Sequence, residues 1–162
     1  MHSTQKLLLF HHLSIIAGLF YYGFNIQYAL IILFGCIVWA YIVGHKGLHM
    51  YMAHTKYKDC IKSYLYTFGA LVTGVGSPLT FAATHRQHHA FHDTEKDPHS
   101  PEHIGWYNVW LMNYNSQYIS PRLVKDFLKS DFQKFMNRHW IQITIAMLVV
   151  LFLIDPRLVC FV

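Results

Sequence analysis

The stretch YALIILFGCIVWAYIVGHKGL, residues 28–48, carries no charged side chain before Lys46. As a helix, its 21 residues would be about 31 Å long at 1.5 Å per residue, which matches the hydrocarbon core of a bilayer. This stretch decides the fold class, because it predicts a helix that crosses a membrane.

Two further apolar blocks lie on either side of this stretch. Residues 7–24 form the first, about 27 Å long as a helix, and only the short polar link Asn25-Ile26-Gln27 separates it from residue 28. So short a link predicts an antiparallel membrane hairpin over residues 7–48. No small-residue cleavage site follows the first block, so we interpret it as an anchor and not as a signal peptide. Residues 140–154 form a third apolar block, which ends at Asp155-Pro156.

The composition supports a membrane protein. The chain has 162 residues, which indicates at most one domain, and 54% of them are apolar while only 13% are charged. Soluble domains carry about 25% charged residues. A very apolar soluble core is the alternative, but the apolar residues lie in long blocks. The expected fold class is therefore all-α, with multi-pass integral membrane helices.

The positive charges predict the orientation. Eleven of the thirteen Lys and Arg residues lie between Lys46 and Arg138, whereas Arg157 alone falls on the far side of the third block. Because positive charges concentrate on the cytoplasmic side, the N-terminus and the middle region, residues 49–139, are expected in the cytoplasm. The charges are scattered and form no patch or stripe, which argues against a nucleic-acid partner.

The number of histidines is the main functional signal. The chain has 13 of them, and histidine is a common metal ligand. Most of the histidines fall into three clusters. These are His45, His49 and His54; then His85, His88 and His89; then His92, His99 and His103, with Asp97 among them.

The second cluster, His85-Arg86-Gln87-His88-His89, has the spacing of a ligand set. Positions i, i+3 and i+4 of a helix lie on one face, so three imidazoles would point the same way. Neutral imidazole suits iron, copper and zinc. Since surface histidines are scattered and core histidines are usually single, we expect this cluster to bind a metal.

The first cluster fits a helix less well. His45 and His49 have the favourable i, i+4 spacing, whereas His49 and His54 are five residues apart, about 140° round an α-helix. This second pair can share a metal only if the helix is distorted or ends there; otherwise the two rings must reach different metals. Helical geometry alone would favour His45 and His49.

The residues from Thr84 to Trp106 resemble the membrane-bound acyl-CoA and acyl-lipid desaturases. That family's second box, His-Arg-x-His-His, is matched in full by residues 85–89, and its downstream Asp-Pro-His and His-Ile-Gly-Trp runs are matched at residues 97–99 and 103–106. Its first box, His-Arg-x-x-x-His, fits residues 49–54 with Met50 in place of the arginine. The resemblance extends over roughly residues 10–160.

The resemblance implies a set of metal ligands and an activity. The ligands would be His49, His54, His85, His88 and His89, in a non-haem di-iron centre on the cytoplasmic side, with the two boxes close together. With O2 and two electrons from a carrier such as ferredoxin or cytochrome b5, the centre would introduce a cis double bond into an acyl-lipid or acyl-CoA. No side chain can oxidise an unactivated methylene, so a metal and O2 are needed. Whether His45 or His99 contributes stays open.

The chain departs from the family pattern in two places. The family's third box, His-x-x-His-His, is absent, so we expect a fragment, although a second polypeptide could complete the site or the protein could be inactive. Where members commonly carry paired arginines, before the His-Ile-Gly-Trp run, only Ser100-Pro101-Glu102 stands here. In members that act on acyl-CoA those arginines can hold its phosphates, so their loss favours acyl-lipid.

Several alternatives remain at this stage. A related membrane di-iron hydroxylase would also use histidine boxes, and a metal transporter would place its ligands at mid-bilayer. Asp93, Glu95 and Asp97 could orient imidazoles or form only a solvated acidic loop. Residues 61–81, an apolar run broken by glycines, fit a helix in the interface. A fourth span there would instead put the first two histidine clusters on opposite sides of the membrane.

Overall fold

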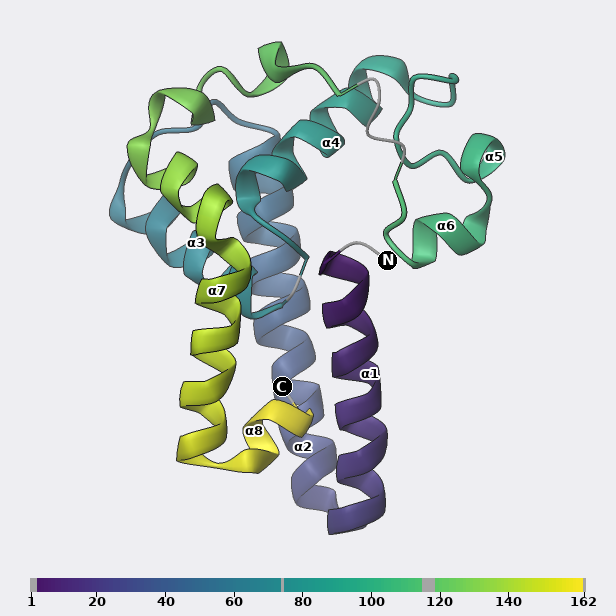
Figure 1. The fold of residues 1–162 in the computed structure, drawn as a ribbon, viewed down its shortest axis with the longest axis vertical. Helices are drawn as coiled ribbons and strands as arrows, with labels where there is room; N and C mark the ends of the chain where they lie inside the picture. The colour runs from purple at the N-terminus through teal and green to yellow at the C-terminus, as the bar shows by residue number, and fades with distance from the viewer. Residues whose placement is uncertain (1–2, 74, 115–118, 162) are drawn as a thin grey trace.

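The computed structural model describes residues 3–73, 75–114 and 119–161, and within these ranges the chain forms helices and no strand (Figure 1). The predicted all-α class is confirmed. The longer helices are α1 (Ser3–Tyr22), α2 (Ile26–Gly35), η1 (Cys36–Ala53), α3 (Ile61–Val72), α4 (Pro78–Phe91) and α7 (Asp131–Ile154). The short ones are α5 (Pro101–Ile104), α6 (Trp106–Trp110), η2 (Pro121–Val124), η3 (Phe127–Lys129) and α8 (Pro156–Phe161).

The N-terminal half forms a helical hairpin, with α1 antiparallel to the continuous pair α2 and η1 (Figure 1). The link between them contains Asn25, whose side chain caps α2 by accepting the backbone N–H of Tyr28 at 3.1 Å. Gly35 keeps right-handed helical backbone angles, so α2 passes into η1 without a break. The winding then changes, since η1 is a π-helix, in which each N–H bonds to the carbonyl five residues earlier.

Two helical segments of the described chain are long and apolar enough to cross a membrane, Ile26–Ala53 with 28 residues and Asp131–Ile154 with 24. Only 17% and 6% of their most apolar windows are buried. Such apolar surface, left uncovered by protein, fits lipid contact better than water. Helix α1 also has 20 residues but is not among these two, so its membrane span stays a prediction.

Helix α3 lies in the region where a fourth span was the alternative. It has 12 residues, about 18 Å, which is too short to cross the hydrocarbon core. It packs closely on η1 through two glycines. A Cβ at Gly47 would lie 2.3 Å from the Tyr66 ring, and one at Gly69 would lie 2.9 Å from Val43. The first two histidine clusters therefore lie at one end of the molecule.

A buried polar network fixes α7 against the rest of the fold. The Gln133 side chain is fully buried and donates to the Tyr57 hydroxyl at 3.0 Å and to Thr67 Oγ1 at 2.8 Å. Next to it, the Tyr57 ring stacks on the Phe127 ring of η3, with the two ring centroids 4.4 Å apart. These contacts join α7 to η3, and the η2–η3 segment lies beside α4, at the end of the long helices opposite the α1–α2 turn (Figure 1).

Candidate metal centre

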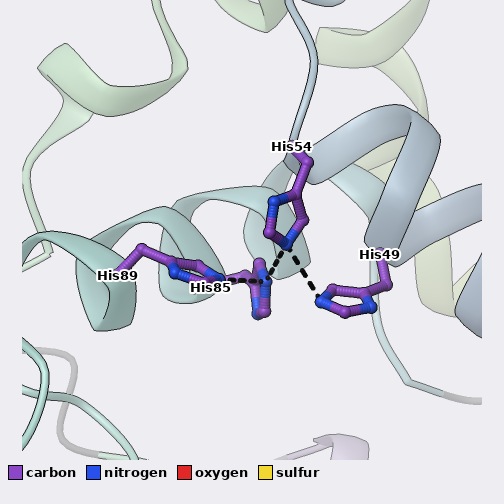
Figure 2. A group of neighbouring side chains, drawn as sticks. All are labelled: His49, His54, His85 and His89. Atoms are coloured by element: carbon purple, nitrogen blue, oxygen red, sulfur yellow. Dashed lines mark hydrogen bonds between the residues drawn. The ribbon is translucent and has the colours of Figure 1, made fainter.

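Four histidines from two distant parts of the chain meet at this end of the molecule. His49 lies in the last turns of η1 and His54 caps it, while His85 and His89 lie one turn apart on α4. Ring nitrogens of all four lie within 4.8 Å of one another. The Nε2 atoms of the three pairs His49–His54, His54–His85 and His85–His89 are each 3.0 Å apart (Figure 2). The expected proximity of the two boxes is confirmed.

The π-winding of η1 explains how His49 and His54 share this site. The backbone N–H of His54 donates to the carbonyl of His49 at 3.1 Å, so residues five apart lie one above the other. This is the helix distortion that the five-residue spacing required. His45 contacts the far side of the His49 ring, Nδ1 to Nδ1 at 3.3 Å, and lies outside the group of four.

The fifth predicted ligand, His88, belongs to a second group with His92 and Asp97. The His88 ring centroid lies 6.3 Å from that of His85, so the two groups adjoin. His92 was not among the ligands predicted from the sequence. Its spacing of i+4 from His88 was the available signal, because His92 caps α4 and the centroids of the two rings come within 4.8 Å.

The Asp97 carboxylate orients His88. Its side chain is wholly buried and lies 2.8 Å from His88 Nδ1. Burial alone would raise the pKa of Asp97, but hydrogen bonds from the His99 backbone N–H, from His88 and from the Asp93 N–H together hold it below the usual value. An ionised carboxylate only accepts, so Nδ1 of His88 carries the proton and Nε2 keeps its lone pair for a metal.

The other two acidic residues of the loop behave differently. Asp93 lies 2.9 Å from His92 Nε2, in an exposed pair. Glu95 is exposed, and the described residues offer it no hydrogen bond or ion pair. Of the three acids considered from the sequence, Asp97 therefore has the buried, multiply bonded position expected of an orienting residue.

Within the four-histidine group, His85 and His89 have lowered pKa values. Burial, and then the positive charge of the neighbouring histidines, lower the pKa of His85 to about 3. The pKa of His89 is lowered by the same causes in the same order. Both rings therefore favour the neutral form at pH 7, which is the form of imidazole that binds a metal. Converging neutral imidazoles fit a transition metal such as iron, copper or zinc.

Arg86, which belongs to the second box, is hydrogen-bonded to the backbone of the first box. Its guanidinium donates to three carbonyls at the end of η1, those of Met52 at 3.2 Å, Ala53 at 2.8 Å and Thr55 at 2.7 Å. Helix ends leave such carbonyls without intrahelical partners, so Arg86 satisfies groups that would otherwise need water. The end of η1, which holds His49 and His54, is thereby fastened to α4.

Asp126 holds Arg86 in place. It pairs with the guanidinium in two parallel bonds, 2.7 Å to Nη1 and 3.0 Å to Nη2, and accepts the Tyr57 N–H at 2.6 Å. Burial would raise the pKa of Asp126, but the bonds from Arg86 and Tyr57 keep it below the usual value. Neither Arg86 nor Asp126 was given a role from the sequence.

Asp126→Asn is expected to destabilise the chain by about 2 kcal/mol, because it leaves the partly buried guanidinium without its counter-charge. Both side chains are largely covered, with exposures of 18% for Arg86 and 11% for Asp126. Thermal unfolding of the purified chain in detergent measures the effect. The control is Asp131→Asn at the exposed pair with Lys134, where we expect a loss below about 1 kcal/mol. Equal losses of stability in the two variants would contradict a stabilising role of the Arg86–Asp126 pair.

The family model for fatty acid desaturase matches residues 15–161 of the chain. The chain belongs to this family. The resemblance found in residues 84–106 is thus confirmed, and the two groups of histidines are built largely from the desaturase boxes. No solved structure gives a significant match.

Named desaturases are among the similar curated proteins. Delta-9 acyl-lipid desaturase 2 of Arabidopsis thaliana is 32% identical over 108 residues, which cover 60% of this chain and 35% of the relative. A palmitoyl-monogalactosyldiacylglycerol delta-7 desaturase of the same plant is 28% identical over a match that covers 88% of this chain and 39% of the relative. An acyl-CoA 5-desaturase of Anemone leveillei is 29% identical over a match that covers 57% of this chain and 31% of the relative. The desaturase chain therefore spans about a third of the length of these relatives.

Proposed function

We propose that the chain forms the part of a membrane fatty-acyl desaturase that carries the first two histidine boxes, with a non-haem di-iron centre that uses O2 to introduce a cis double bond. The carrying observation is that four imidazoles of these boxes converge within 4.8 Å. They do so at the end of two helices whose apolar surfaces are uncovered. Family membership and the desaturase names of the relatives support the same activity.

In this proposal each iron has its own group of ligands. His49, His54, His85 and His89 would hold one, and His88 with His92 and Asp97 would hold or orient the second. Iron with O2 supplies the oxidising power that no side chain has. Burial and neighbouring charge keep the imidazoles of His85 and His89 neutral, Asp97 holds the proton on His88 Nδ1, and Arg86 fixes the end of η1. Overall, two substrate hydrogens, two electrons and two protons reduce O2 to two waters as the double bond forms.

We further propose a multi-pass membrane protein with the histidine boxes on the cytoplasmic side. Its parts would be a hairpin over residues 7–48, a histidine-box region over residues 49–139 and a span over residues 140–154. The clustering of positive charge between Lys46 and Arg138 supports this orientation. An acyl-lipid is the preferred substrate, because several relatives carry acyl-lipid names and because Ser100-Pro101-Glu102 replaces paired arginines. The electrons would come from a ferredoxin or a cytochrome b5.

The test is to isolate the protein from its native membranes, in the length in which it occurs there. It is supplied with acyl-lipid, O2 and a reduced carrier, and the acyl chains are analysed by gas chromatography and mass spectrometry. We expect unsaturated products and bound iron. Hydroxylated acyl chains would identify a hydroxylase instead. Bound iron without any oxidised product would overturn the proposed activity.

A further inference from the structure

An open cleft of about 700 Å³ lies directly beside the four-histidine group. The end of η1, one side of α4 and the η2–η3 segment line it, and His54 and His89 form part of its wall. Both of these histidines are exposed. Basic side chains from all three elements also line the cleft: Lys56, Arg86, Arg122, Lys125 and Lys129.

The charge of this cationic cleft is largely uncompensated. Among the described residues of the lining, Asp126 is the only acidic one, and it is already bound by Arg86 and by the Tyr57 N–H. Within the described ranges, the side chains of the other four basic residues form no ion pair and no cation–π contact. All four are exposed. The cleft therefore presents free positive charge beside the candidate metal ligands.

The position of the cleft indicates that it is reached from water. The elements that line it, the end of η1, α4 and the η2–η3 segment, lie at the end of the long helices away from the α1–α2 turn and from the exposed apolar end of α7 (Figure 1). The span Ile26–Ala53 has 28 residues, whereas about 20 suffice to cross the hydrocarbon core. The end that bears His54 can therefore extend past the core. An acyl chain drawn from the bilayer would come from the opposite direction.

We propose that this cleft is the docking site for a small acidic electron-carrier protein; the proposal rests on the desaturase function above. Uncompensated positive charge round an open hollow speeds the approach of an acidic protein and orients it. A carrier seated there would touch His54 and His89, two of the candidate ligands. Each encounter oxidises the carrier by one electron, so two encounters supply the two electrons that one double bond consumes.

The lining fits a protein partner better than a small anion. A specific small-molecule site places a few polar groups in a cavity that encloses most of the ligand. Here the basic side chains are exposed at the rim of a wide cleft, so they can form pairs with the surface of a partner. Anionic lipid headgroups are the rival partner for such charge, and the experiment separates the two.

The experiment measures docking without catalysis. The chain is placed in nanodiscs of uncharged phosphatidylcholine lipid, and association with an oxidised plant-type [2Fe–2S] ferredoxin is followed by surface plasmon resonance at several salt concentrations. The cleft variant combines Lys125→Glu with Lys129→Glu. The matched control combines Lys58→Glu with Lys96→Glu, which changes the net charge equally at exposed residues outside the lining.

We expect the cleft variant to associate at least about tenfold more slowly at low salt, and the control to stay within about twofold of the unmodified chain. Added salt should slow the unmodified chain strongly. Absence of ferredoxin binding, or equal losses in both variants, would overturn the docking site. Binding of the same nanodiscs to phosphatidylserine vesicles is measured in parallel, and a cleft variant that loses only this binding and keeps ferredoxin binding would also overturn the docking site. A chain that docks ferredoxin but forms no product would refute the desaturase activity and not the docking.

Discussion

His85→Ala is expected to lower the affinity of the purified chain for Fe2+ by at least about a hundredfold. His85 is central to the group, because its Nε2 lies 3.0 Å from those of both His54 and His89 and its ring contacts His49. Changes to residues that only support a ligand cost about 10- to 100-fold, so loss of a ligand itself should cost at least as much. Anaerobic titration with Fe2+, followed by equilibrium dialysis, measures the affinity.

The control for this prediction is His12→Ala. His12 lies on α1, where its Nδ1 donates to the Leu8 carbonyl at 2.7 Å, and it belongs to neither metal-binding group. We expect the Fe2+ affinity of this variant to stay within about threefold of that of the unmodified chain. Circular dichroism should show the same helix content in both variants. If His85→Ala keeps both its helices and its affinity, the four-histidine group is not the metal site.

Asp97→Asn is expected to weaken metal binding by about 10- to 100-fold, the usual cost of losing a carboxylate that orients a histidine ligand. The amide keeps the shape of the side chain but loses its charge. It can also present its NH2 group to His88 Nδ1, which would place the imidazole proton on Nε2 and remove the lone pair from the metal. The same Fe2+ titration provides the measurement.

Glu95→Gln provides the comparison for Asp97→Asn. Glu95 lies in the same acidic loop and is exposed, so removing its charge changes the local potential without breaking a buried contact. We expect an effect below about twofold. Similar losses in the two variants would mean that the loop acts only through its overall negative charge and that Asp97 does not orient His88.

The parts of the fold that could be predicted from the sequence are the helices with long runs of apolar side chains. The apolar blocks predicted two antiparallel helices in the N-terminal part and a further long helix near the C-terminus, and the structure contains these helices. Helix α7, however, begins at Asp131, nine residues before the apolar block. The Ser130 side chain caps it by accepting the Gln133 N–H, and the first turns bury Gln133 and Met136. A polar yet buried turn carries no hydrophobic signal, so its helix was not apparent from the sequence.

The site was less accessible from the sequence. The family register paired His49 with His54, whereas helical geometry favoured His45, because the hydrogen-bond register of a backbone cannot be deduced from its side chains. Asp126 was out of reach for a different reason. It pairs with Arg86 forty residues away in the chain and belongs to no motif, so only the folded arrangement brings its carboxylate to the boxes.

Because η1 is a π-helix, the two histidines of the first box reach the same site only when they are five residues apart. One residue fewer between His49 and His54 would suit an ordinary α-helix, and one more would leave both windings out of phase. The number of residues between His49 and His54 and the winding of η1 must therefore change together if the two rings are to stay in one site. An insertion or deletion in these four intervening residues would be more damaging than replacing any one of them, and such length changes should be rare as the gene drifts.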